Sequence, residues 1–139
     1  MPRLRETYRR ASQVPIRSEL YPGEETFFRQ NPHVAGRAAE DNSVTLNPYS
    51  KLTQREQLSV VQNERARVIM RSGNSPGFRL TKDQKKAFRG YGTDQDIRET
   101  IVGRIISGDR SAGAFTKEQS EFANRLKSRY FRGGAGRGV

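Results

Sequence analysis

Three carboxylates come closest to a catalytic set in this sequence. Glu40 and Asp41 are adjacent, and either of them with Glu64 would supply the acid and the base of a glycosidase. Such a site also needs a sugar-sized cleft and an environment that raises the pKa of one carboxyl group. A chain of 139 residues without tryptophan offers little to build it. We therefore interpret Glu40 and Asp41 as a turn that leads into a strand, and we expect no enzymatic activity.

The usual parts of a metal site or a catalytic triad are missing. His33 is the only histidine and there is no cysteine, so neither a sulfur-ligated zinc site nor a Ser-His-Asp triad can be assembled. His33 follows Asn31 and Pro32 in an expected turn, which favours a solvated or capping role. We predict no cofactor, no metal and no small-molecule substrate.

A glycine-rich segment, RGGAGRG at 132–138, is the one candidate phosphate loop. It follows an expected helix instead of leading from a strand into one, and it lacks the lysine and the Ser/Thr of a P-loop. It is similar to the Arg-Gly-Gly stretches of flexible nucleic-acid-binding proteins, which bind with little sequence preference. A solvated, flexible tail and a binding tail are both compatible with it.

Basic side chains dominate the charge of the chain. Lys and Arg number 26 against 15 acidic residues, a net charge of +11, which favours an acidic partner such as nucleic acid or the acidic face of a protein. No homeodomain, zinc-finger or RNP signature is present. We expect two basic helices to share a surface that contacts nucleic acid or an acidic partner. The candidate contact residues are Lys82, Lys85, Lys86, Arg89, Arg125, Lys127, Arg129 and Arg132.

Two parts of different composition must position these side chains. Residues 1–52 contain five of the six prolines, and proline removes a backbone donor and favours extended geometry in the residue before it. This part is predicted to be an extended arm with a short helix at 24–30 and a short strand at 43–47. Apolar residues make up only 32% of the chain, so the core must be small.

From Thr53 a helix-start signal recurs four times. Thr is followed three residues later by Glu, Gln or Asp at Thr53, Thr81, Thr93 and Thr116, as in a capping box. The pattern predicts a small helical domain at 53–131, with helices at about 53–71, 81–89, 94–107 and 117–131. The first is expected to carry Leu58, Val61, Val68 and Ile69 on its apolar side, and the third Ile97, Ile101 and Ile105. The fold class is therefore mainly α, with the arm before it and the tail at 132–139 after it.

The starts LTKDQKKAF at 80–88 and FTKEQSEFA at 115–123 are similar. We favour two well-capped helix starts over a duplication. No apolar run is long enough for a membrane span, and the basic start is followed by no apolar signal segment, so we expect a soluble, unexported chain without a membrane partner.

Two longer blocks carry a resemblance to known proteins. They are NPHVAGRAAEDNSVTLNPYSKLTQREQLSVVQNERARVIMR at 31–71 and YGTDQDIRETIVGRIISGDRSAGAFTKEQSEFANRL at 91–126. They resemble small proteins of tailed bacteriophages and prophages. The resemblance covers a little over half of the chain and transfers no catalytic residue. It implies a component of the virion or of its assembly, located in the particle and, during assembly, in the host cytoplasm.

The leading hypothesis is a non-enzymatic structural protein at the head-tail junction, tail or capsid surface. It would be present in several symmetry-related copies and would dock on other virion proteins through its arm. A strand as short as 44–46 can complete the sheet of a neighbour. The expected partner-binding residues are Leu20, Tyr21, Phe27, Phe28, Val44, Leu46 and Tyr49. A basic nucleic-acid-binding accessory protein is the alternative.

Overall fold

Each of the four threonine signals begins a helix, as predicted. In the computed structural model, which describes residues 8–108 and 114–131, the four helices are α2 (Gln54–Arg71), α3 (Lys82–Ala87), α4 (Asp94–Ser107) and α5 (Lys117–Tyr130). In every case the threonine hydroxyl accepts a hydrogen bond from the third backbone N–H of the helix, and the side chain at that position accepts one from the threonine N–H. The described fold is mainly α-helical.

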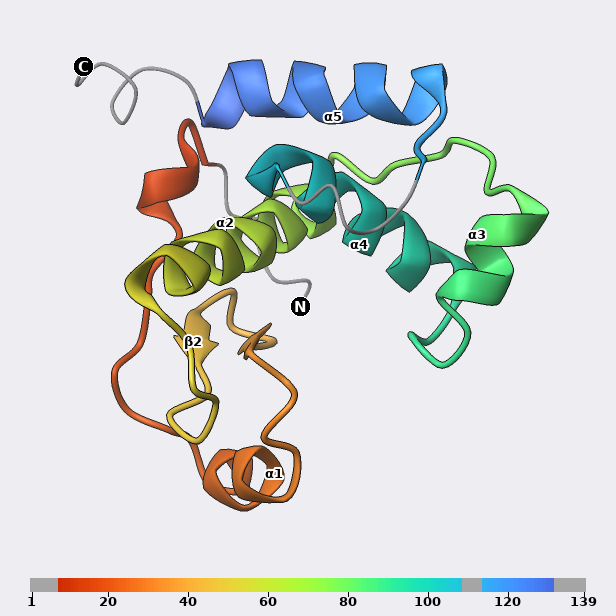
Figure 1. Cartoon of the computed structure of the whole chain (residues 1–139). Coiled ribbons are helices and arrows are strands. Elements are labelled where there is room, and N and C mark those ends of the chain that lie inside the picture. The colour runs from red at the N-terminus through yellow and green to blue at the C-terminus, as the bar shows by residue number, and fades with distance from the viewer. Residues whose placement is uncertain (1–7, 109–113, 132–139) are drawn as a thin grey trace, which may run out of the picture.

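The core lies where α2, α4 and α5 meet. In Figure 1, α2 and α4 occupy the centre of the molecule and α5 lies across them. Ile69 and Met70 of α2 are fully buried with Ile101 and Val102 of α4. Leu58 is the exception to the predicted apolar side of α2, because its side chain is 67% exposed. Residues 54–58 at the start of α2 are all exposed, so this apolar side chain is not covered by the core.

The N-terminal part contains the predicted short helix, α1 (Glu24–Gln30), and the predicted short strand, β2 (Val44–Leu46). It also contains two elements that were not predicted, the 3-10 turn η1 (Ala11–Gln13) and the strand β1 (Gly36–Ala38). The two strands are antiparallel, with Arg37 opposite Thr45. On its other edge β2 has a single parallel bridge to Ile16.

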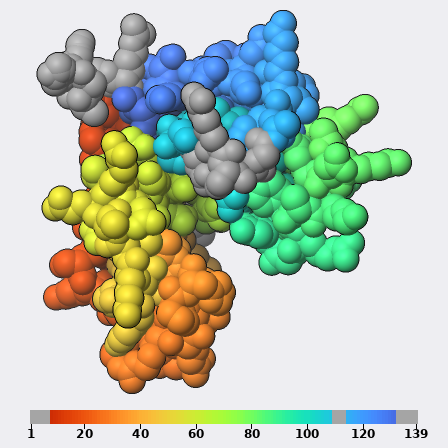
Figure 2. Space-filling model, in the orientation of Figure 1, coloured from red at the N-terminus to blue at the C-terminus, as the bar shows by residue number. Residues whose placement is uncertain are grey.

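Irregular backbone connects these elements, as the prolines predict, but the N-terminal part does not stand apart from the helices. Val14 and Val44 are fully buried and belong to the same core as α2, α4 and α5. The Nε–H of Arg65 on α2 donates to the carbonyl of Val14 at 3.1 Å. Figure 2 shows the segment around α1 and the segment around α3 as two projections with a hollow between them.

None of the helices within residues 8–108 and 114–131 is both long and apolar enough to cross a membrane.

Candidate functional site

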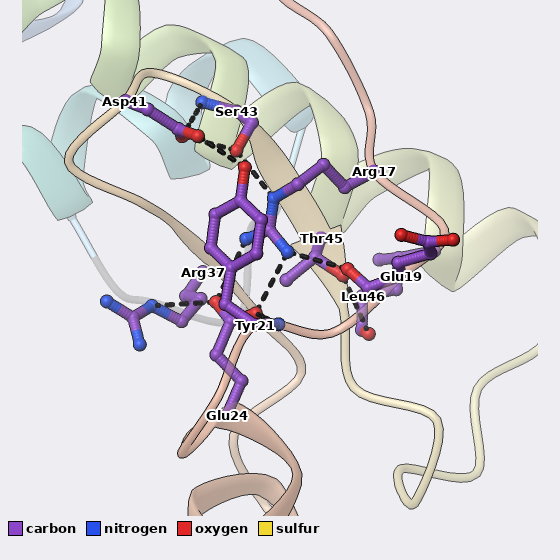
Figure 3. A network of polar contacts seen from close by, with 9 residues as sticks. All are labelled: Arg17, Glu19, Tyr21, Glu24, Arg37, Asp41, Ser43, Thr45 and Leu46. Atoms are coloured by element: carbon purple, nitrogen blue, oxygen red, sulfur yellow. Dashed lines mark hydrogen bonds and ion pairs between the residues drawn. The ribbon is translucent and has the colours of Figure 1, made fainter.

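The first candidate pair, Glu40 and Asp41, lies in the turn between β1 and β2, as predicted. Asp41 accepts hydrogen bonds from the N–H and the hydroxyl of Ser43 and from the hydroxyl of Tyr21 (Figure 3). The Ser43 hydroxyl bond, and next the Tyr21 bond, lower the pKa of Asp41 to about 2. Asp41 is therefore an ionised acceptor that shapes the turn.

Glu24, the first residue of α1, is another carboxylate of the same hydrogen-bond network. Its two oxygens accept from both terminal nitrogens of Arg17 at 2.9 Å, and it is 3% exposed. The hydrogen bond from Arg17 lowers the pKa of Glu24 most, and the bond from the Tyr21 N–H lowers it further, although burial acts in the opposite direction. Arg17 also donates through Nε to Ser43 at 2.6 Å, so this one guanidinium joins α1 to β2.

Glu64, the third of the carboxylates that the sequence analysis considered for catalysis, lies outside this network. It lines a cleft with a volume of about 500 Å³ between β1, α2, α4 and the turn before α4. The walls are His33, Val34, Ala35, Gly36, Val60, Gly90 and Tyr91, the floor is Asn63, Glu64, Arg67, Thr100 and Gly103, and Arg104 lies at the mouth. The hollow in Figure 2 lies between the chain segments that supply these walls.

Gly103 brings the two floor helices together. A Cβ atom at this position would lie 2.7 Å from Oδ1 of Asn63 and 3.4 Å from its Cα. A larger residue would displace the Asn63 amide from its present place between α2 and α4. The polar groups of both helices therefore face the same cleft.

The cleft floor holds polar atoms that the described fold does not satisfy. Asn63 Oδ1 and Arg67 Nε are buried and make no hydrogen bond. Arg67 donates through Nη2 to Thr100 at 3.1 Å, and its Nε lies 3.6 Å from the Glu64 carboxylate. Burial raises the pKa of Glu64, and the charge of Arg67 only partly offsets this. Buried polar atoms without partners are uncommon in folded proteins, and a bound molecule is one ordinary explanation for them.

Arg104 stands at the mouth of the cleft on an aromatic support. Its guanidinium carbon lies 5.1 Å from the ring centre of Phe88 and 5.8 Å from that of Tyr91, and Nη2 donates to the Tyr91 hydroxyl at 3.2 Å. The two rings pack edge to face. Cation–π contacts of this kind hold a guanidinium in place while leaving its outer edge available.

The seven residues expected to bind a partner fall into three groups. Phe28 and Val44 are fully buried inside the chain, so they are not part of an exposed docking surface. Tyr21, Phe27 and Tyr49 are exposed by about two fifths. Leu20 and Leu46 line a second, smaller groove of about 350 Å³ beside Ile16.

The burial of Phe28 and Val44 has a simple cause. Phe28 is one of two buried residues of α1, and Val44 belongs to the hydrophobic core that residues of α2 and α4 also form. The strand itself is also occupied, because the N–H of Val44 donates to Pro15 and its carbonyl accepts from Arg17. On the side away from β1, β2 is therefore partly paired within its own chain.

The expected shared basic surface is not formed. The start of α3 packs on the start of α5, where Gln84 and Gln119 exchange hydrogen bonds at 2.7 Å. Arg125, Lys127 and Arg129 lie on the last turns of α5, and Arg125 and Arg129 border a depression with Gly73 and Ser75 beyond α2. The basic residues of α3 therefore lie near the opposite end of α5. Arg132 and the RGGAGRG segment lie outside the described residues.

Sequence reasoning missed the cationic side of the cleft. Arg67 and Arg104 were counted only as part of the overall charge, and Asn63 was not singled out. One signal was available, because Arg67 follows Glu64 by three residues and Asn63 by four, which places it next to both on the helix surface. In residues 8–108 and 114–131, no group of three or more His, Asp or Glu side chains is arranged to hold a metal ion.

Comparison of the chain with protein-family models, with curated proteins and with solved structures finds no match in any of the three.

Proposed function

We propose that this chain is a non-enzymatic structural protein of a bacteriophage particle. In this role it is a small linker or accessory subunit at the head-tail junction, tail or capsid surface, present in several symmetry-related copies. The blocks at 31–71 and 91–126, which resemble proteins of tailed phages, support the proposal, and so does the distribution of exposed apolar side chains.

That distribution is the observation that carries the docking role. Among the described residues, six large hydrophobic side chains are exposed, and five of them fall in 16–58. The five are Ile16, Tyr21, Phe27, Tyr49 and Leu58, and the sixth is Tyr91. Contiguous exposed apolar patches are typical of interaction surfaces, and we propose that side chains of this segment supply one. The groove lined by Leu20 and Leu46 belongs to the same part.

The test is the composition of purified particles. Particles from an induced lysogen that encodes the chain are purified by density gradient and analysed by quantitative mass spectrometry. The proposal expects the chain at a constant copy number per particle, in a multiple that fits the symmetry of the portal, tail or capsid. Its absence from particles whose other structural proteins are all detected would falsify the proposal.

A nucleic-acid-binding accessory protein is the second candidate. The net charge of +11 supports it, together with the exposed Lys82, Lys85, Lys86 and Arg89 on and just after α3. Binding through phosphates releases counterions, so affinity for DNA would fall steeply with salt. We expect the affinity for a duplex of random sequence to drop by at least roughly tenfold between low and moderate salt. An affinity that does not change with salt would remove this candidate.

A further inference from the structure

The cleft between β1, α2 and α4 combines two features that together point to one kind of occupant. They are an unpaired strand edge and an excess of arginine. The occupant inferred from them depends on the proposed role of the chain as a docking protein.

The strand edge is the outer side of β1. The register places Arg37 and Thr45 opposite each other, with Ala39 bonded to Ser43 and Asn47 bonded to Ala35. In an antiparallel pair this alternation turns the N–H and C=O groups of the residues between them, Gly36 and Ala38, away from β2. Among the described residues no hydrogen bond uses these groups. Unpaired strand edges are templates for another strand.

The edge borders the cleft. Residues 33–36 line it and no residue of β2 does, so the cleft begins beside Gly36, the first residue of β1, whereas Arg37 and Ala38 lie outside its lining and are reached by a segment that continues along the strand. Its volume of about 500 Å³ is within the range of sites that take a ligand, ~300 to 1,000 Å³. A short extended segment placed there has the strand edge on one side and the floor of α2 and α4 on the other.

The floor and mouth favour a negative charge on that segment. Arg67 and Arg104 face the cleft against a single carboxylate, Glu64. Arg104 is already oriented by Phe88 and Tyr91, and Arg67 by Thr100, so little side-chain freedom is lost when either binds an anion. The apolar wall formed by Val34 and Val60 accommodates side chains that flank the charge.

We propose that this cleft receives an extended peptide segment of a partner protein, which pairs with the outer edge of β1 and places an acidic side chain against Arg104 and Arg67. Backbone hydrogen bonds to Gly36 and Ala38 supply the register, and the carboxylate supplies the specificity. The docking proposed for the exposed side chains Tyr21, Phe27 and Tyr49 is a separate contact.

The experiment uses the full chain labelled with nitrogen-15 and a synthetic probe, the acetylated and amidated pentapeptide Thr-Val-Asp-Val-Thr. Its matched control has asparagine in place of the aspartate. Amide and arginine side-chain shifts are followed during titration to millimolar peptide. The expected result is saturable movement of the Gly36 and Ala38 amides and of the Arg104 Nε–H signal. The asparagine peptide should bind roughly tenfold more weakly.

Two variants separate the two contacts. Arg104→Gln should lower the affinity for the aspartate peptide to that for the asparagine peptide. Arg125→Gln removes the same charge from α5 and should leave the affinity for both peptides unchanged. Ala38→Pro deletes an outward N–H that the β1–β2 ladder does not use, and it should weaken both peptides alike. Unchanged signals outside the cleft show that each variant is folded.

Three results would overturn the proposal. The first is no movement of cleft signals at millimolar peptide. The second is equal loss of binding in Arg104→Gln and Arg125→Gln, which means general attraction to a basic protein. The third is binding of acetate alone as strong as that of the peptide, with β1 amides unmoved, which means a simple anion site. If the peptide fails while the chain is found in particles, only the cleft assignment is lost. If the peptide binds but particles lack the chain, the cleft assignment stands and the virion role falls.

Discussion

Asn47 fixes the junction between α1 and β2 because its side chain uses both ends of its amide. Its Nδ2 donates to the carbonyls of Phe28, Asn31 and Val34, and its Oδ1 accepts from the N–H of Tyr49 at 2.8 Å. The residue is 2% exposed. One side chain therefore satisfies carbonyls at the end of α1 and starts the turn after β2.

We expect Asn47→Ala to lower the free energy of unfolding by about 1 to 3 kcal/mol, because it leaves the Val34 carbonyl and the Tyr49 N–H without this partner, whereas the Phe28 and Asn31 carbonyls keep their backbone donors. Urea unfolding measures the change. Asn124→Ala is the control, since Asn124 is exposed on α5 and should have an effect within about 0.5 kcal/mol. Equal effects of the two variants would mean that the amide is not a structural clamp.

The carboxylate of Asp41 gives a pH dependence whose direction follows from its pKa. Its folded pKa is about 2 and its ordinary value is 3.8, so the unfolded chain takes up the proton first. The stability that Asp41 contributes is present above about pH 4 and is lost as the pH falls toward 2. Urea unfolding at several pH values should show that the unfolding free energy of Asp41→Asn falls less between pH 4 and pH 2 than that of the wild type. Glu40→Gln, an equal change of charge next to it but outside the network, should keep the wild-type slope.

At the scale of elements, the two similar helix starts that the sequence showed at 80–88 and 115–123 pack against each other. Gln84 and Gln119 exchange amide hydrogen bonds at 2.7 Å while each also completes the capping box of its own threonine. Each glutamine also bonds to the backbone before the other helix. Gln119 donates to the carbonyl of Arg79, two residues before Thr81, and Gln84 donates to the carbonyl of Ala114, two residues before Thr116. A capping signal that is local in the sequence thus also joins two helices.

A double-mutant cycle tests this joint. Gln84→Leu and Gln119→Leu should each cost about 2 to 3 kcal/mol, because each leaves the other buried amide without its partner. The double variant should cost less than the sum by about 1 kcal/mol or more, since the unpaired amide is then gone. Thermal or urea unfolding supplies the four values. Strict additivity would show that the glutamines act only as separate caps.

Local signals explain which elements the sequence predicts and which it does not. Threonine caps and proline stops depend on neighbours within four residues, so α2 to α5 were predicted within about two residues. β1 was not, because Gly-Arg-Ala has no alternation and becomes a strand only through pairing with β2. The cleft was not predicted for the same reason, since Asn63 and Gly103 come together only through the packing of α2 on α4.

At the scale of the whole molecule, burial divides the apolar residues into those that hold the fold and those that are free to contact a partner. Ile101 is fully buried between helices, so Ile101→Asp places an unpaired charge in the core and should lower the unfolding free energy by more than about 4 kcal/mol. Tyr49 is 37% exposed, so Tyr49→Ala should leave the chain folded while weakening docking. Circular dichroism and incorporation into particles measure the two effects. Equal unfolding by both variants would assign Tyr49 to the core.

The remaining question at this scale is whether the N-terminal part is ordered before any partner binds, and hydrogen exchange of the isolated chain answers it. The N–H of Val44 donates to Pro15 at 2.8 Å, that of Arg17 to Val44 at 2.7 Å and that of Asn47 to Ala35 at 2.9 Å. Since Val44 shares the core of α2 and α4, these amides should open with the helices and show protection close to that of Ile69 and Ile101. Gly36 and Ala38 serve as internal controls, because their N–H groups point away from the ladder and should exchange fast. Fast exchange at Val44 with protected helices would mean that the N-terminal part folds only on its partner. In that case the binding free energy of docking would also have to cover the cost of ordering it.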